Sequence, residues 1–478
     1  MKKTKIICTI GPSTDDRSKM QALVKNGMDI ARFNFSHGTH QEQKAKMDLL
    51  KEVREELGKP VAILLDTKGP EIRTGLLKGG EKVRLEEGRL FTLTADETVG
   101  DDTRVSLTYK GLTKDIKVGQ KILIDDGLIE LEVRELVGSD VLCTVINGGE
   151  LGERKGVNVP NVPVRLPALT DKDKEDIMFG VSQGIDFIAA SFVRSGQAIQ
   201  EIRELLKTYN APYIPVIAKI ENEEGIKNID EIIQCADGIM VARGDLGVEI
   251  PPEEIPHIQK WLIQKCNESY KPVITATQML DSMIRNPRPT RAEVTDVANA
   301  VYDGTDAVML SGETAQGKYP IEALKMMSQI VKNAEKYLDY DRLLQKAKDS
   351  QKKNISSAIG YSSVAAAASL DAKCIITPTV TGATARVVSK FRPKAKIMGV
   401  SPNEESLRRM QIYRGVYPVK SIPYETTEEI CDEAVKMVKE MGFVAQGDVV
   451  VVTAGIPSPS IKKDRDGISN MMQIVVVK

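Results

Sequence analysis

Eight short apolar segments, separated by amphipathic stretches, most constrain the fold of this 478-residue chain. Each segment is almost continuously apolar and β-branched, which is typical of strands buried on both faces of a parallel sheet. Amphipathic stretches such as Arg17–Asn26 and Ser195–Tyr209 lie between them and predict helices. Strands and helices in this alternation predict an α/β protein built on a (β/α)8 barrel. The candidate strands are Lys5–Gly11, Ile30–Ser36, Val61–Thr67, Asp186–Phe192, Pro215–Glu221, Gly238–Asp245, Pro272–Gln278 and Ala307–Gly312.

One interruption breaks this alternation after the third candidate strand. Residues 71–170 lack a good helical pattern and instead carry short alternating runs, with turns such as Gly79-Gly80 and Gly148-Gly149 between them. This pattern predicts a small β domain inserted into the barrel. After the polar stretch Asp339–Asn354, strand and helix patterns alternate again, which predicts a doubly wound α/β domain. We therefore assign residues 1–70 and 171–340 to the barrel, 71–170 to the insertion and 341–478 to a C-terminal α/β domain.

Composition excludes several classes of protein. The chain has 66 Lys plus Arg against 67 Asp plus Glu, so its net charge favours neither nucleic acid nor an anionic membrane as a partner. No apolar run approaches the length of about 18 residues that spans a bilayer. The six cysteines form no Cys-x-x-Cys pair, which favours reduced core thiols over disulfides or a zinc site. We expect a cytoplasmic protein.

Polar side chains gather at the carboxyl ends of the candidate strands. Barrel enzymes carry their catalytic groups on this face. Several of these residues are two apart, so both side chains leave a strand on the same side. One such pair could be a structural ion pair, but pairs on five strands favour an active site. The residues are Arg32, Asn34, Ser36, Asp66, Thr67, Ser191, Lys219, Glu221, Arg243, Asp245, Thr275, Thr277, Ser311 and Glu313.

The chemical types at these strand ends favour phosphoryl transfer. Glu221 and Asp245 lack histidine or cysteine neighbours, which suits Mg²⁺ or Mn²⁺. Lys219, Arg32 and Arg73 add positive charge, and phosphoryl transfer depends on positioning and charge neutralisation. Neither a P-loop nor a kinase-type glycine-rich loop occurs in the sequence.

Across nearly its whole length the chain resembles the pyruvate kinases, whose characteristic segments it carries in family order. These segments are Arg32–Gly38, Leu65–Arg73, Ala218–Asn222, Val241–Gly247, Ala276–Leu280 and Met309–Thr314. The resemblance implies transfer of a phosphoryl group from phosphoenolpyruvate to ADP, giving pyruvate and ATP in glycolysis. It also implies Mg²⁺ (or Mn²⁺) and K⁺ as cofactors, activation by a phosphosugar, a homotetramer, and a role for the inserted β-barrel as a lid. The chain resembles the bacterial members that lack an additional phosphohistidine-like C-terminal domain.

The resemblance also implies roles for individual residues. Catalysis would involve Lys219, Thr277, Arg32, Arg73 and Ser311. The substrate would contact Arg32, Gly244, Asp245 and Thr277. The nucleotide would lie near Asn34, His37, Arg73 and Lys155. Mg²⁺ would bind Glu221 and Asp245, and K⁺ would bind Asn34, Ser36, Asp66 and Thr67.

Two further positions bear on regulation and cofactor use. Glu71 is the form found in members that require K⁺, and we hypothesise that K⁺ supplies a positive charge that Glu71 does not. An effector site is expected in the hydroxyl-rich turn after the strand that begins at Ile375, although Thr381 or Thr384 could instead simply cap a helix. Its predicted residues are Thr379, Thr381, Gly382, Ala383 and Thr384. The basic 457–467 loop could bind phosphate or be an ordinary solvated turn.

Two alternatives stay open at this point. Lys219 could form a Schiff base in a metal-dependent lyase or aldolase that uses Glu221 and Asp245. The chain could also be a non-catalytic phosphosugar sensor in which only the C-terminal domain acts, although the joint presence of Lys219, Glu221, Asp245 and Thr277 argues against this.

Overall fold

The computed structural model describes residues 1–349, 351–423, 427–455 and 468–478. These residues form two compact units, one comprising 1–65, 180–188 and 261–478, the other 66–179 and 189–260. The boundaries of the three predicted domains stay a prediction, but the three predicted sheets are all present. None of the helices within the described residues is long and apolar enough to cross a membrane.

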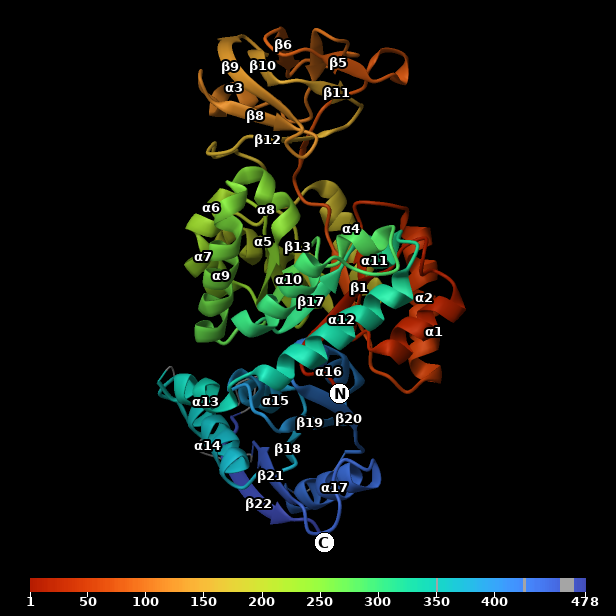
Figure 1. Ribbon diagram of the computed structural model, residues 1–478, viewed down its shortest axis with the longest axis vertical. Helices are drawn as coiled ribbons and strands as arrows, with labels where there is room; N and C mark the ends of the chain where they lie inside the picture. The colour runs from red at the N-terminus through yellow and green to blue at the C-terminus, as the bar shows by residue number, and fades with distance from the viewer. Residues whose placement is uncertain (350, 424–426, 456–467) are drawn as a thin grey trace. The chain divides into compact units, whose positions relative to one another are not determined.

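A closed eight-stranded barrel confirms the predicted fold class (Figure 1). Its strands follow the order β1-β17-β16-β15-β14-β13-β3-β2, and neighbouring strands such as β1 and β17 or β14 and β15 are parallel. Every predicted barrel strand is present. Each begins at the predicted residue or one residue later, and each ends one to three residues before the predicted end. The bounds are β1 Lys5–Thr9, β2 Ile30–Asn34, β3 Ala62–Asp66, β13 Phe187–Ala190, β14 Val216–Ile220, β15 Gly238–Ala242, β16 Val273–Ala276 and β17 Ala307–Leu310.

An aspartate directly precedes every second barrel strand and binds the amino end of the strand before it in the chain. Each of these carboxylates accepts a hydrogen bond from a backbone N–H of the preceding strand. The pairs are Ile6 N to Asp29 at 2.7 Å, Ile63 N to Asp186 at 2.8 Å, Val216 N to Asp237 at 2.8 Å and Val273 N to Asp306 at 2.9 Å. Each carboxylate also pairs with a cation, because a buried charge needs a partner. The cations are Lys2 for Asp29, Arg408 for Asp186, Arg203 for Asp237 and Arg392 for Asp306.

The barrel helices begin and end where local sequence signals specify. Helix α2 (His40–Glu56) begins with a capping box in which Thr39 and Glu42 satisfy each other's backbone N–H groups. Helix α1 (Arg17–Asn26) ends at Gly27, whose φ of 105° only glycine adopts readily. The remaining helices up to residue 334 are α3 Leu112–Asp115, α4 Asp171–Ser182, α5 Gly196–Thr208, α6 Glu223–Lys227, α7 Ile229–Cys235, α8 Arg243–Glu249, α9 Ile255–Ser269, α10 Arg291–Asp303, α11 Gly312–Ala315 and α12 Pro320–Ala334.

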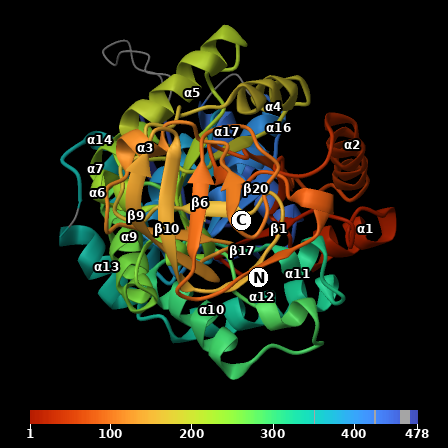
Figure 2. The ribbon, with the colours of Figure 1, turned by 90° about the horizontal axis from the view of Figure 1, so that it is seen from above.

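The insertion is a curled seven-stranded sheet, some of whose strands are seen in Figure 2. Its two edge strands, β4 and β7, meet through a bridge between Thr74 and Leu107, and Thr108 N donates to Arg73 O at 2.9 Å. The sheet therefore closes on itself in the manner of a small barrel around its own apolar core. The seven strands are β4 Ile72–Arg73, β6 Leu90–Thr94, β7 Arg104–Ser106, β8 Lys121–Ile124, β9 Ile129–Val137, β10 Asp140–Asn147 and β12 Gly156–Asn158. A separate two-stranded sheet in the insertion pairs β5 Val83–Leu85 with β11 Gly149–Leu151.

The C-terminal sheet is doubly wound, as predicted, in the order β20-β19-β18-β21-β22. Ile375 and Ile397 pack toward one apolar cluster, whereas Ile376 and Met398 pack toward another on the opposite face. The polar stretch 339–354 contains a helix, α13, which the polarity of the sequence obscured. The elements are α13 Tyr340–Asp349, α14 Ile355–Ser369, β18 Cys374–Pro378, α15 Ala383–Lys390, β19 Lys396–Ser401, α16 Glu404–Arg409, β20 Val416–Lys420, α17 Thr427–Glu440, β21 Val449–Ala454 and β22 Met471–Val476.

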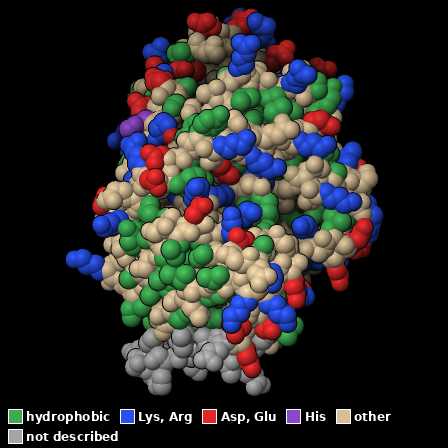
Figure 3. Space-filling view, turned by 60° about the horizontal axis from the view of Figure 1, so that its bottom comes forward, with side chains coloured by type: hydrophobic (Ala, Val, Ile, Leu, Met, Phe, Trp, Pro, Cys, Tyr) green, Lys and Arg blue, Asp and Glu red, His purple; other side chains and the backbone are tan. Residues whose placement is uncertain are grey.

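The surface charge is mixed, as the balanced composition suggests. In Figure 3, Lys and Arg side chains alternate with Asp and Glu and with hydrophobic patches over the face shown.

Candidate active site

A buried lysine joins the carboxyl ends of three barrel strands. Lys219, on β14, extends its Nζ to 3.0 Å from Oδ1 of Asp66 at the end of β3. The same nitrogen donates to the Ser191 hydroxyl just after β13, at 2.7 Å, and lies 2.9 Å from Oε1 of Glu221. The strand ends thus surround one fixed positive charge with two carboxylates.

Glu221 is a buried carboxyl group of this cluster with a raised pKa. Its side chain is 1% exposed, and burial raises its pKa to about 7, against the opposing attraction of Lys219 and with a further rise from Asp245. Oε2 accepts from the backbone N–H of Phe192 at 2.6 Å. Oε1 is buried and, although close to Lys219, accepts no hydrogen bond of good geometry. One oxygen therefore keeps unused capacity to bind a ligand.

Glu221 and Asp245 fit a hard divalent cation. Asp245 is exposed in the first turn of α8, next to Gly244, and its charge acts on Glu221. Two carboxylates suit Mg²⁺, which retains several waters and needs few protein ligands. The described part of the chain contains no group of three or more His, Cys, Asp or Glu that could hold a metal.

The oxygens predicted to bind K⁺ occur as two pairs. Thr67 Oγ1 accepts from the backbone N–H of Ser191 at 3.1 Å, beside the fully buried Asp66. Asn34 Oδ1 accepts from the backbone N–H of Ser36 at 3.0 Å. The first pair belongs to the unit that contains Lys219 and the second to the other unit, so a single four-residue K⁺ site stays a prediction.

Arg73, predicted to contact phosphate, and Lys155, predicted to lie near the nucleotide, are both paired within the protein. The guanidinium of Arg73 donates to Glu71 at 2.6 Å and to the carbonyl of Arg154 at 2.8 Å. Lys155 pairs with Asp125 at 2.9 Å. Both side chains are about one-third exposed, so these pairs are weak enough to exchange for a phosphate.

The strand ends of the other unit carry a strained threonine. Thr277, directly after β16, has a φ of 72°, and the next residue, Gln278, has a φ of 54°. A β-branched residue rarely adopts this conformation, and such strain is concentrated at functional sites. Arg32 on β2 donates to Thr9 Oγ1 at 3.0 Å, and His37 is exposed beyond the same strand.

Glu313 ties two of the predicted catalytic loops together. Its buried carboxylate accepts from Leu280 N at 3.0 Å with one oxygen and from Ser311 N at 2.8 Å with the other. Burial raises its pKa. The loop after β16, which carries Thr277, is thereby linked to Ser311 after β17. The sequence places Glu313 and Ser191 at strand ends but gives neither a role. Their places in the sequence, Glu313 close to Ser311 and Ser191 at the end of a barrel strand, were the signals that could have identified them.

The predicted effector loop begins α15 without a capping side chain. Gly382, with a φ of 85°, is the N-cap, and its N–H donates to Thr379 Oγ1 at 3.0 Å. The hydroxyl of Thr384 instead contacts Ser469 Oγ at 3.0 Å, and Thr381 is exposed. The simple capping role considered for Thr381 or Thr384 is therefore wrong. The 457–467 loop lies outside the described residues.

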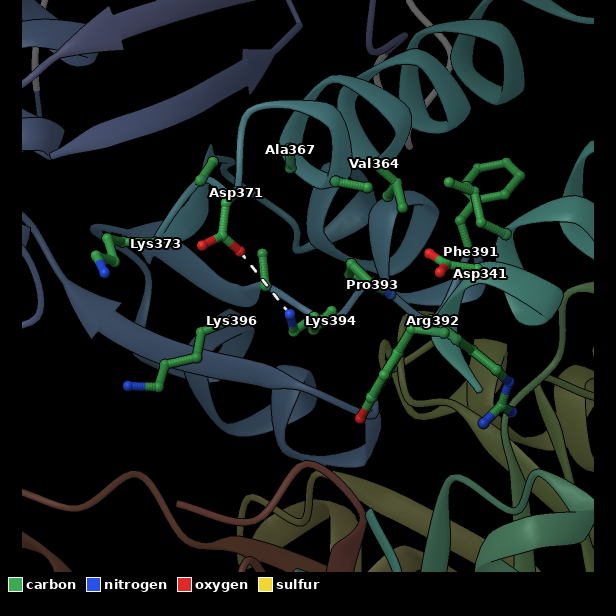
Figure 4. Close-up of a pocket in the computed structure, with 15 residues that line it drawn as sticks. Asp341, Val364, Ala367, Asp371, Lys373, Phe391, Arg392, Pro393, Lys394 and Lys396 are labelled. Carbon is green, nitrogen blue, oxygen red and sulfur yellow. Dashed lines mark ion pairs between the residues drawn. The ribbon is translucent and has the colours of Figure 1, made fainter. Parts of the chain in front are cut away.

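The C-terminal domain also contains a cavity of about 290 Å³, which lies at the amino ends of β18 and β19 (Figure 4). Lys394 pairs with Asp371 at 3.9 Å across it. Lys373 and Lys396 extend to the side away from the apolar wall formed by Val364 and Ala367. This cavity is separate from the loop at residues 379–384, which follows the carboxyl end of β18.

The fold and the site define a (β/α)8-barrel enzyme with a buried lysine–carboxylate centre. The family description "Pyruvate kinase, barrel domain" matches residues 1–324, and "Pyruvate kinase, alpha/beta domain" matches residues 357–475. The chain therefore belongs to the pyruvate kinase family and is a phosphotransferase.

Individual relatives resemble the chain over its full length. The pyruvate kinase of Geobacillus stearothermophilus is 53% identical, covering 100% of this chain and 80% of that protein. The pyruvate kinase of Clostridium acetobutylicum is 50% identical, with 100% of both chains covered. A crystal structure of a pyruvate kinase from Cryptosporidium parvum superposes with a TM-score of 0.94 at 42% identity, covering 100% of this chain and 96% of that one.

Proposed function

We propose that this enzyme transfers the phosphoryl group of phosphoenolpyruvate to ADP, giving pyruvate and ATP as a cytoplasmic homotetramer. Phosphoryl transfer needs fixed charge and exact positioning more than covalent chemistry from the protein. The observation that carries the proposal is the buried Lys219, held by Asp66, Glu221 and Ser191. Its ammonium would face the phosphoryl group in flight, and its position is fixed before the reaction begins.

The divalent ion would bind Glu221 and Asp245, where it would neutralise charge on the phosphoenolpyruvate. Glu221 must be ionised to act as a ligand, and a bound cation would favour that form against the burial that raises its pKa. The backbone at Gly244 and the Thr277 hydroxyl would hold the substrate carboxylate. Arg32 and Arg73 would contact phosphate groups, and His37, Asn34 and Lys155 would lie near the nucleotide.

Protonation of the enolate would occur near Thr277 and Ser311. Thr277 is held in a strained backbone conformation, and Glu313 fixes the loops of both residues. The inserted β-barrel would close over the substrates and exclude water. A phosphosugar would bind at residues 379–384, and K⁺ at Asn34, Ser36, Asp66 and Thr67 would add positive charge near the phosphates.

The lyase alternative gains no support from the site. A Schiff-base lysine must react as a neutral amine. Lys219 is flanked by two carboxylates at 2.9 and 3.0 Å, which balance the charge of an ammonium. A fixed cation fits these surroundings better than a nucleophile.

Metal activation of pyruvate formation tests the proposal. Glu221→Gln should raise the Mg²⁺ concentration required for half-maximal activity by about tenfold or more, because one charged ligand is lost. Glu224→Gln, which alters a more exposed carboxylate on α6, is the matched control and should leave it unchanged. An unaltered Mg²⁺ requirement in Glu221→Gln would refute the assigned metal site.

A further inference from the structure

A groove of about 770 Å³ is lined by none of the predicted substrate or effector residues. It is formed by the carboxyl end of α2 with the turn after it, together with α16, β20 and the carboxyl end of α17. All of these elements belong to one compact unit. A volume in this range is typical of sites for small organic ligands.

Two guanidinium groups of like charge face this groove. Arg408 Nε donates to the buried Asp186 at 2.7 Å, and Arg54 Nη1 donates to the carbonyl of Val61 at 3.2 Å. Burial, and next the positive charge of Arg408, hold the pKa of Arg54 below its ordinary value. Two partly buried cations that share the field of one aspartate would be stabilised by an added anion.

A lysine strengthens the positive character of this end of the groove. Lys59, in the turn after α2, has no ion-pair partner within the described residues. The other two lysines of the lining, Lys51 and Lys420, are paired with Asp48 and Glu404. Two acidic side chains, Glu55 and Glu440, also line the groove and limit how much negative charge it accepts.

The opposite wall is apolar. Leu407 and Val419 are buried in the C-terminal sheet region, and Met437 and Met441 lie at the end of α17. Met441 is 53% exposed, although a large apolar side chain gains from being covered. Methionines adapt to irregular ligands because their side chains are flexible and polarisable. A ligand here would meet cations at one end and apolar surface at the other.

We propose that this groove binds a small amphipathic organic anion, with a phosphate or carboxylate near Arg54, Arg408 and Lys59 and an apolar body against Met437 and Met441. The site is coupled to the barrel through Arg408. Its partner Asp186 directly precedes β13, and Ser191, directly after that strand, donates to Asp66 and accepts from Lys219. Occupancy is therefore expected to change the affinity for phosphoenolpyruvate, in addition to any effect of a ligand at residues 379–384.

Calorimetric titration with hexyl phosphate tests the proposal, with saturating phosphoenolpyruvate present to occupy the active site. Inorganic phosphate and hexanol serve as comparisons that lack the apolar body or the charge. The proposal predicts saturable binding of hexyl phosphate that is at least about tenfold tighter than binding of either comparison, since both ends contribute. Equal affinity for hexyl phosphate and inorganic phosphate would overturn the amphipathic assignment.

Charge variants locate the binding. Lys59→Glu and Met441→Asp should each weaken hexyl phosphate binding by about tenfold. Lys25→Glu changes an exposed lysine at the end of α1, outside the groove, and should leave the affinity unchanged. Glu440→Gln should strengthen binding. Thermal unfolding of each variant checks that it remains folded. Absence of saturable binding, or affinity that is the same in Lys59→Glu and Met441→Asp as in the unchanged protein, would refute the site.

Discussion

Lys219 Nζ lies 2.9 Å from Glu221 Oε1, at the buried carboxyl end of one barrel strand. Asp66 is 3.0 Å from the same nitrogen, so two carboxyl groups surround one ammonium. Because Asp245 adds another negative charge nearby, these surroundings would favour a divalent cation beside the fixed lysine. The same contacts therefore explain both the predicted metal and the predicted catalytic cation.

The K⁺ requirement is expected to depend on Glu71. In the structure Glu71 pairs with Arg73 at 2.6 Å, so part of the positive charge near the predicted phosphate site is neutralised. Glu71→Lys should retain much of its activity when K⁺ is replaced by a bulky organic cation, whereas the unchanged protein should lose most of its activity. Steady-state rates in the two salts measure this. Equal rates of the unchanged protein in both salts would contradict the role given to K⁺.

Glu313 is expected to act as a positioning residue. Replacing it with Gln exchanges one of its two accepting oxygens for a donor that faces a backbone N–H, a mismatch that costs about 1–3 kcal/mol. Glu313→Gln should therefore lower kcat by about tenfold or more, with a smaller effect on KM, because Thr277 and Ser311 shift. Glu322→Gln, on the exposed surface of α12, is the control. A kcat equal to that of the control would show that the two loops hold their positions without Glu313.

The stability of the protein should depend on the charge of Lys3. Burial, and next the charge of Arg414, lower the pKa of Lys3 from 10.5 to about 7, with Glu335 opposing and Lys394 and Lys396 adding to the effect. The Lys3 ammonium also contacts the ring and hydroxyl of Tyr340. Between about pH 7 and 10.5 the unfolded chain binds a proton at Lys3 that the folded protein lacks. Stability therefore rises with pH across this window, by up to about 1.4 kcal/mol per pH unit.

Thermal unfolding at about pH 7 and about pH 9 measures this effect. The increase in Tm over this interval should be smaller in Lys3→Met than in the unchanged protein. Lys25→Met, an exposed lysine, should behave like the unchanged protein. The same increase in both variants would exclude Lys3 as the titrating group.

Activation by a phosphosugar should depend on the turn before α15. Thr384→Val removes a hydroxyl that is hydrogen-bonded to Ser469. The concentration of sugar phosphate needed for half-maximal activation should rise by about tenfold, because the loss of one good hydrogen bond weakens binding by about that factor. Thr295→Val, on exposed α10, is the matched control. Activation curves with a sugar monophosphate and a sugar bisphosphate measure it. Identical curves for Thr384→Val and the control would move the effector site elsewhere.

The barrel was predictable because its strands are buried on both faces. Apolar runs such as Val61–Thr67 and Ala307–Gly312 need no tertiary information to be recognised, although their ends depend on the local turns. The short strands β4, β7, β11 and β12 were missed because two or three residues carry no periodic signal. Helix α13 was missed because it buries none of its residues, so its polarity resembled that of a linker.

The sequence predicted which strand ends carry the site residues, but not how close these residues lie to one another in space. Lys219 and Glu221 are two apart on one strand, so their proximity follows from the pleat. The approach of Asp66 and Ser191 to Lys219 depends on how separate strands are staggered in the barrel, which no local pattern specifies. The strained φ of Thr277 and the buried bridge made by Glu313 likewise depend on packing between loops.

Pyruvate formation from phosphoenolpyruvate and ADP, with Mg²⁺ and K⁺ present, tests the central claim most directly when the unchanged protein is measured beside Lys219→Met. We predict robust turnover in the unchanged protein and a loss of about a thousandfold or more in the variant, because a fixed charge in a water-excluded site supplies several kcal/mol of transition-state stabilisation. Lys207→Met, on the surface of α5, should retain full activity. Comparable turnover in Lys219→Met, or an unchanged protein that is inactive with and without sugar phosphates, would contradict the account.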